Sequence, residues 1–134
     1  MKKYLIILLF SIMAIEHCIG QKDTMYTYHS AFELANHLKI LELFDPGTKT
    51  KFILDSVQIH ISAVDSNGNK IWTTDPHRDG ALERYRFDRP IIVEFYFANS
   101  KRTGNKEVIW IIYNNTQFGF VDKKTGKFTW LGQD

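Results

Sequence analysis

Apolar and polar residues alternate along much of the chain beyond residue 56, and this two-residue period limits the possible folds more than any other feature. In VQIHISA (57–63) every second residue is apolar, and IIVEFYF (91–97) has apolar residues at every second position along one face. Successive side chains of a strand point to opposite faces of a sheet, so this pattern predicts half-buried strands. EVIWIIY (107–113) is apolar on both faces, which predicts a central strand that is covered on both sides.

Short runs of turn-forming residues join these predicted strands. DSNGN (65–69) is rich in residues that favour tight turns, and residues 70–73 are predicted to return as a short partner strand. DKKTG lies in the middle of residues 117–131 and places Gly126 where a hairpin needs a positive φ. The second half of the chain therefore predicts antiparallel hairpins.

One segment near the N-terminus has helical spacing instead. Ser30 followed by Glu33 fits a capping box, in which the two side chains satisfy free amides at a helix start. The apolar residues that follow recur at intervals of three and four, which predicts one amphipathic helix; they are Ala31, Leu34, Ala35, Leu38 and Leu41. Asp45-Pro46-Gly47 is predicted to stop this helix, because proline cannot continue it.

One helix followed only by strands predicts an α+β domain, with the N-terminal helix packed on a curved antiparallel sheet of five or six strands. This layout is similar to that of cystatin-like and NTF2-like domains. The likeness concerns the order of elements alone, and no sequence motif of either family accompanies it.

The first 20 residues have the pattern of a secretory signal peptide. Lys2 and Lys3 precede an apolar stretch over residues 4–15, and Cys18 and Gly20 occupy the small-residue positions before a cleavage site. The stretch is shorter than the roughly 20 residues that span a bilayer. We expect cleavage after Gly20, no membrane span thereafter, and a single secreted or periplasmic domain of residues 21–134, with a bacterial origin. A lipid anchor on Cys18 is disfavoured, because Glu16 and His17 stand where small residues belong.

Composition narrows the possible functions. Cys18 is the only cysteine, so cleavage would leave a chain without disulfides or thiol chemistry, held together by its hydrophobic core. The formal net charge is +2, and no one-signed basic stripe of the kind that binds nucleic acid is present.

No GxSxG, HExxH or paired-histidine motif occurs, so no catalytic residue, metal site or cofactor is predicted. Asp75, His77 and Asp79 alternate and could approach a cation, but a solvated loop is the simpler interpretation.

The stretch from residue 74 to 90 holds four of the five arginines together with four acids. Arginine beside tyrosine is favoured at the anchors of protein interfaces, so we predict that a protein partner binds here. The predicted contact residues are Arg78, Arg84, Tyr85, Arg86 and Arg89. RYRF (84–87) alternates, which predicts a short strand with its aromatics inward and its guanidinium groups outward. A purely structural loop and a site for a small anionic ligand stay open as alternatives.

The aromatic residues suggest a second possible site. Glu94, Tyr96 and Trp110 could line a pocket between the helix and the sheet, as in a small-ligand-binding domain or an enzyme. Glu94 could equally face water, and the aromatics could simply be core residues. The first hypothesis is therefore a non-enzymatic binding module of the cell envelope, such as an inhibitor, immunity or accessory protein, and the ligand pocket is the alternative. The oligomeric state is left open.

Overall fold

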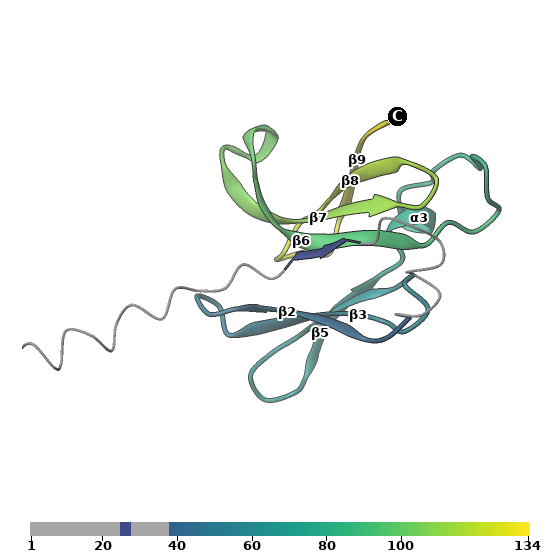
Figure 1. Ribbon diagram of the computed structural model, residues 1–134. Helices are drawn as coiled ribbons and strands as arrows, with labels where there is room; N and C mark the ends of the chain where they lie inside the picture. Colours follow the sequence, from purple (N-terminus) through teal and green to yellow (C-terminus); the bar gives the residue numbers. More distant parts are fainter. Residues whose placement is uncertain (1–24, 28–37) are drawn as a thin grey trace, which may run out of the picture.

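Two antiparallel β-sheets face each other in the computed structural model, which describes residues 25–27 and 38–134 (Figure 1). The first sheet has the order β1-β6-β7-β8-β9 and the second the order β2-β3-β4-β5. The first sheet comprises β1 (Met25–Thr27), β6 (Ile92–Ser100), β7 (Lys106–Tyr113), β8 (Gln117–Val121) and β9 (Phe128–Gln133). The second comprises β2 (Leu41–Asp45), β3 (Thr50–Leu54), β4 (Ile61–Val64) and β5 (Lys70–Thr74).

The α+β prediction is wrong, because the described residues are nearly all β. Their helices are only the short α3 (Pro76–Asp79) and a 3₁₀ turn (Lys101–Thr103). Residues 28–37, which hold most of the predicted helix, lie outside the described residues. The C-terminal end of the predicted helix falls in the strand β2. β2 buries Leu41 and Leu43, exposes the residues between them, and pairs with β3 along its whole length. The layout of cystatin-like and NTF2-like domains therefore does not apply, since two sheets replace one curved sheet under a helix.

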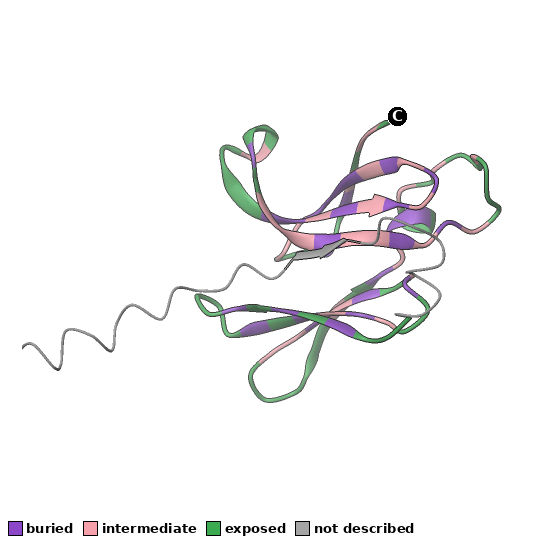
Figure 2. Cartoon of the chain, viewed as in Figure 1, coloured by how far each residue is buried: buried purple, intermediate pink, exposed green. Residues whose placement is uncertain are grey.

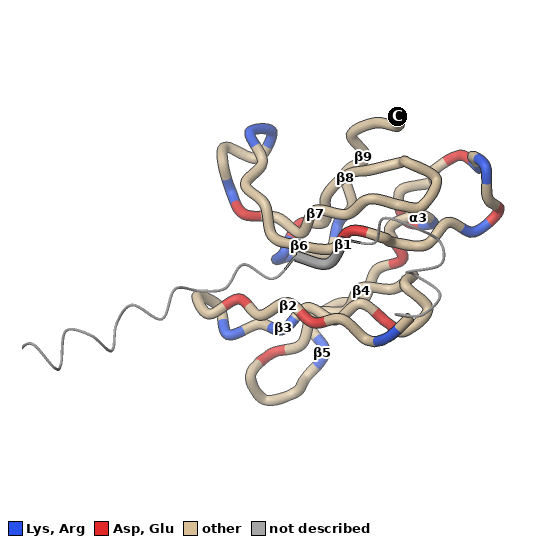
Figure 3. Tube along the Cα trace, in the orientation of Figure 1, with Lys and Arg blue, Asp and Glu red and all other residues tan. Residues whose placement is uncertain are grey.

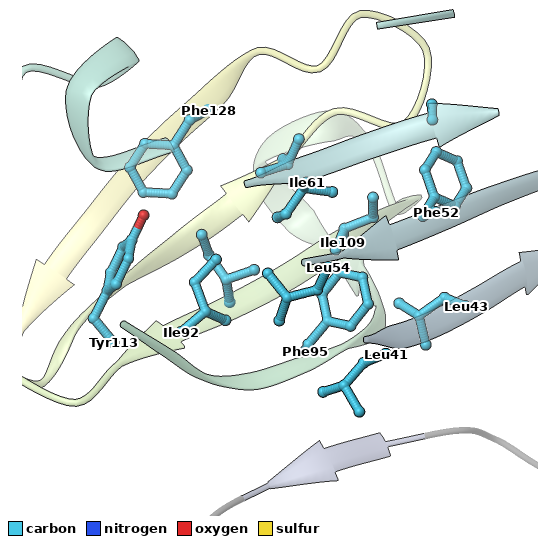
Figure 4. Packing of buried hydrophobic residues seen from close by; sticks show 13 residues of the cluster. Leu41, Leu43, Phe52, Leu54, Ile61, Ile92, Phe95, Ile109, Tyr113 and Phe128 are labelled. Carbon is cyan, nitrogen blue, oxygen red and sulfur yellow. The ribbon is translucent and has the colours of Figure 1, made fainter. Parts of the chain in front are cut away.

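The hydrophobic core lies between the two sheets (Figure 4). The second sheet contributes Leu41, Leu43, Phe52, Leu54, Ile61 and Ala63, and the first contributes Ile92, Phe95, Ile109, Ile111, Tyr113, Val121 and Phe128. The strands alternate between buried and less buried positions along their length (Figure 2). Full burial of each large side chain is worth roughly 1.5–3 kcal/mol, so this layer is the main source of stability.

Two predicted strands depart in part from the sequence prediction, although Ile61 and Ala63 are buried as predicted. In β6, Ile92 and Phe95 are both fully buried although they are three residues apart, because a register shift between Ile92 and Glu94 interrupts the alternation. In VQIHISA only the end forms a strand: Val57 is 53% exposed, whereas Gln58 is fully buried. The Gln58 backbone carbonyl accepts a hydrogen bond from the amide of Ile92 (2.8 Å), which ties this turn to the first sheet.

Both predicted turns are confirmed. The Asp65 amide donates to the carbonyl of Asn69 (2.9 Å) and Gly68 has a φ of 85°, so the chain reverses between β4 and β5. Gly126 has a φ of 72° in the turn between β8 and β9. Local turn chemistry was sufficient to locate these two reversals.

The predicted leader, its cleavage after Gly20 and Cys18 all lie outside the described residues. In the part of the chain that is described, no helix has the length and apolar character needed to cross a membrane.

Candidate functional site

A loop between α3 and β6 carries two of the predicted contact arginines away from the sandwich. In Figure 3 it is the excursion beyond α3 on which acidic and basic positions alternate. We call residues 83–88 the arginine loop. The side chain of Arg84 is 81% exposed, and its one ion pair among the described residues is a long one with Asp88, 3.4 Å between Nη1 and Oδ1. An ion pair this exposed contributes little to stability, so Arg84 remains available for other contacts.

The tip of the arginine loop reverses tightly at Arg86. The amide of Phe87 donates to the carbonyl of Tyr85 (2.6 Å), and Arg86 between them has a φ of 59°. Such three-residue reversals are rare and strained in L-residues, and strain of this kind is concentrated at functional sites. The guanidinium carbon of Arg86 lies 4.9 Å from the centre of the Tyr85 ring, which it covers. The predicted strand with inward aromatics is therefore wrong, and Phe87 is 47% exposed beside the arginines.

Two buried amide side chains hold the backbone of this loop from behind. Asn115 and Gln117 are both buried, at the turn between β7 and β8 and at the start of β8. Asn115 Nδ2 donates to the carbonyl of Tyr85 (3.1 Å), and Gln117 Nε2 donates to the carbonyl of Glu83 (3.2 Å). Asn115 Nδ2 also donates to Gln117 Oε1 (2.8 Å), which orients the two amides. Sequence reasoning missed both residues, because a polar NNTQ run between apolar strands has the composition of any ordinary turn.

Arg89, another predicted contact residue, makes an ion pair within the fold. Its guanidinium forms an ion pair with the mostly buried carboxylate of Asp75. Burial alone would raise the pKa of Asp75, but hydrogen bonds from Arg89 and from the Arg78 amide outweigh it and hold that pKa below its ordinary value. Arg78 itself is exposed, with Nε 3.9 Å from the same carboxylate. Of the five predicted contact residues, Arg84, Tyr85 and Arg86 thus lie together at the loop tip, whereas Arg78 and Arg89 gather around Asp75.

Asp75, His77 and Asp79 do not converge on a cation position. Asp75 caps the start of α3, and Asp79 accepts hydrogen bonds from the Thr74 hydroxyl (2.7 Å) and the Asp75 amide (2.9 Å). His77 is buried against the Tyr113 ring, and burial together with the Arg89 charge lowers its pKa. In the described ranges, no group of three or more His, Cys, Asp or Glu side chains is placed to hold a metal ion.

The three predicted pocket residues lie on one face of the first sheet, the face away from the core. Glu94 and Tyr96 flank the buried Phe95, and Tyr96 pairs with Trp110 across the strands. All three predicted residues are half-buried, and the pKa of Tyr96 is raised by burial and by the nearby Glu94 charge. Trp110 stacks on Phe118 with 6.0 Å between ring centres. A pocket between a helix and this sheet is not formed by the described residues, because their helices are both short and lie at loops.

The arginine loop therefore combines exposed arginines, an exposed phenyl ring and a backbone fixed by buried amides. No protein-family model, curated protein or solved structure matches the chain.

Proposed function

We propose that this protein is a small, non-enzymatic binding domain of a bacterial cell envelope, and that it holds a protein partner through the arginine loop. The observation that carries the proposal is the combination of exposed Arg84, Arg86 and Phe87 with a backbone held by buried Asn115 and Gln117. The signal-peptide pattern of residues 1–20 supports export. An inhibitor, immunity or accessory role agrees with a loop whose side chains are suited to non-covalent binding.

The chemistry of the loop indicates what the partner offers. Arginine and aromatic side chains provide most of the energy at protein interfaces when they enter fitted pockets. Arg84 and Arg86 suit carboxylates on the partner, because a guanidinium binds a carboxylate through two parallel hydrogen bonds. Phe87 suits an apolar hollow beside those acids. A backbone that is already fixed loses little further conformational entropy on binding, so a short loop of this kind can support a useful affinity.

A capture experiment with matched variants tests the proposal. The tagged protein is cross-linked in the envelope of its source cells, the captured partner is identified by mass spectrometry, and its binding is then measured with purified components. We expect the double variant Arg84→Ala, Arg86→Ala to weaken binding at least tenfold, which is about 1.4 kcal/mol. The matched control is Lys101→Ala with Arg102→Ala, which removes two exposed cations from the 3₁₀ turn between β6 and β7.

The control variant should bind as the wild type does, and both variants should keep the wild-type melting temperature. Equal binding by the loop variant and the wild type would show that the arginine loop is not the interface. If the loop variant and the control lost equal amounts of binding affinity, the partner would be attracted to positive charge in general. That result would also contradict the proposal.

A further inference from the structure

A lysine held between two carboxylates joins the two sheets at the end of the sandwich opposite the arginine loop. Lys123 lies in the turn between β8 and β9, Asp45 ends β2, and Glu107 is in β7. Lys123 Nζ is 2.5 Å from Asp45 Oδ2 and 2.5 Å from Glu107 Oε1. The side chains of Lys123 and Asp45 are only 17% and 9% exposed, so water has little access to the contact between them.

Aromatic residues fix the position of the lysine. Its Nζ lies 4.8 Å from the centre of the Phe97 ring, and the Trp72 indole N–H donates to the Lys123 carbonyl oxygen (3.1 Å). Phe52 contacts both rings, with centroids 5.8 Å from each. The amine is therefore held on the Asp45 carboxyl group by its own backbone and by a wall of aromatic side chains.

The Asp45 carboxyl group is held from its other side by hydrogen-bond donors. The Gly47 amide donates to Oδ1 (2.9 Å), and the Thr48 hydroxyl donates to Oδ2 (2.9 Å), the oxygen that also contacts Lys123. A backbone N–H directed at one carboxyl oxygen is the arrangement that stabilises the oxyanion of a tetrahedral intermediate. Nucleophile, electrophile, oxyanion donor and an adjacent carboxylate thus occur together.

We propose that Lys123 and Asp45 condense into an intramolecular amide that links the two sheets covalently. The Nζ lone pair attacks Cγ of Asp45, the Nζ–Cγ bond forms, and the Cγ–Oδ2 bond breaks. Oδ2 leaves as water, carrying two of the three protons of the ammonium group. An ammonium and a carboxylate become an amide and a water molecule, so atoms and charge balance, and no oxidant or co-reactant is required.

Glu107 relays the two protons in this step, one after the other. It takes the first proton from Nζ, which frees the lone pair for attack, and passes it to Oδ2. It then takes the second proton from the nitrogen of the tetrahedral intermediate and passes it to Oδ2, which departs as water. The same contacts favour the ion pair before reaction, since hydrogen bonds from Lys123, Thr48 and Gly47 lower the pKa of Asp45 against the opposing effect of burial. Fixed proximity opposes this preference, because well-oriented neighbouring groups react with effective concentrations on the order of 10⁵–10⁸ M. The only cysteine is Cys18, so a disulfide within the chain cannot supply such a link.

The mass of the denatured, purified protein tests the proposal directly. We expect the wild type to be lighter than its sequence requires by one water molecule. Trypsin should release a branched peptide in which residues 40–49 are joined to residues 107–124, because trypsin does not cleave after an acylated lysine. A folded wild type with the full sequence mass and a normal cleavage after Lys123 would overturn the proposal.

Variants separate the amide from other losses of water. Lys123→Arg keeps the positive charge but should have the full sequence mass, and Glu107→Gln should remain unlinked or link far more slowly. The matched control is Glu42→Gln, which removes the acid from the ion pair with Lys51 on the second sheet (3.1 Å) and should still form the link. A mass deficit that persists in Lys123→Arg would place the lost water elsewhere and refute the assignment, and a fully linked Glu107→Gln would refute the role of Glu107.

Discussion

Replacement of Asn115 by alanine should loosen the arginine loop and destabilise the whole domain. The Asn115 side chain is fully buried and makes three hydrogen bonds. Nδ2 donates to the carbonyl of Tyr85 and to Gln117 Oε1, and Oδ1 accepts from the Gln117 amide (3.1 Å). In the alanine variant, the three partner groups lose their hydrogen bonds to the Asn115 amide at a buried position.

The expected loss of stability follows from these contacts. A typical hydrogen bond contributes about 1 kcal/mol net, and a buried group left without a partner costs about 1–3 kcal/mol. Water entering the vacated space recovers part of this, so we expect Asn115→Ala to lower the free energy of unfolding by about 2–4 kcal/mol. For a domain of this size, that is a large fraction of the roughly 5–15 kcal/mol available.

Two assays measure separate parts of the effect. Urea denaturation followed by tryptophan fluorescence should show a midpoint lower by roughly 0.7–4 M, given a slope of roughly 1–3 kcal/mol per M. Limited digestion with trypsin under native conditions should cleave after Arg84 and Arg86 faster than in the wild type, because the loop backbone has lost an anchor. The matched control Asn67→Ala, in the exposed turn between β4 and β5, should change the free energy of unfolding by less than about 0.5 kcal/mol. An Asn115→Ala protein with an unchanged midpoint and unchanged cleavage rate would refute the anchoring role.

Three further substitutions test other parts of the structure. His77→Phe should flatten the pH dependence of stability. The pKa of His77 is lowered in the folded state, so the stability that the neutral side chain contributes is lost as the pH falls below the unfolded value of about 6.5. Urea midpoints of wild type and variant at pH 5 and 7 measure this loss. Gly119→Ala should lower the melting temperature through a loss of about 1–3 kcal/mol or more, because the new Cβ would lie 2.3 Å from the Thr129 carbonyl oxygen in the paired strand. Arg89→Met should cost about 1–3 kcal/mol in urea denaturation, because the mostly buried Asp75 carboxylate would keep only its longer ion-pair contacts with Arg78 (3.9 Å) and His60 (4.0 Å). Arg84→Met should be nearly neutral, and equal effects would contradict the different roles assigned to the two arginines.

The features of the fold that could be predicted from sequence are the ones set by local chemistry. The turns at residues 65–69 and 122–126 depend on glycine and on short polar side chains that bond their own backbone, so a window of five residues contains the cause. The strand β7 could also be located, because seven consecutive residues with few polar side chains suit a central strand.

The number of sheets could not be predicted, because alternation shows which residues face a core but not which strands pair. The segment 41–45 continued a helical stripe on its N-terminal side and also alternated, and pairing with β3 decided between the two. The register shift in β6 likewise depends on the neighbouring strand rather than on the residues of β6 alone.

The candidate site could be predicted from the sequence only in part, for the same reason. Charge density marked the loop, but the difference between Arg84 and Arg89 depends on Asp75, a residue brought near by the fold rather than by spacing. The anchoring amides at Asn115 and Gln117 lie about 30 residues from the backbone they hold. Contacts of this range leave no periodic pattern in a sequence.

The strand β8 separates the proposed binding loop from the ion pairs of Lys123. It starts at Gln117, which holds the arginine loop, and ends at Val121, two residues before Lys123, whose ion pair with Asp45 joins the two sheets. At about 3.3 Å per residue the two ends are more than about 10 Å apart, a distance at which the effects of substitutions usually add independently. We therefore expect substitutions of Arg84 and Arg86 to leave the ion pairs of Lys123 undisturbed. A loss of partner binding in these variants would then report on the proposed interface and not on the stability of the sandwich.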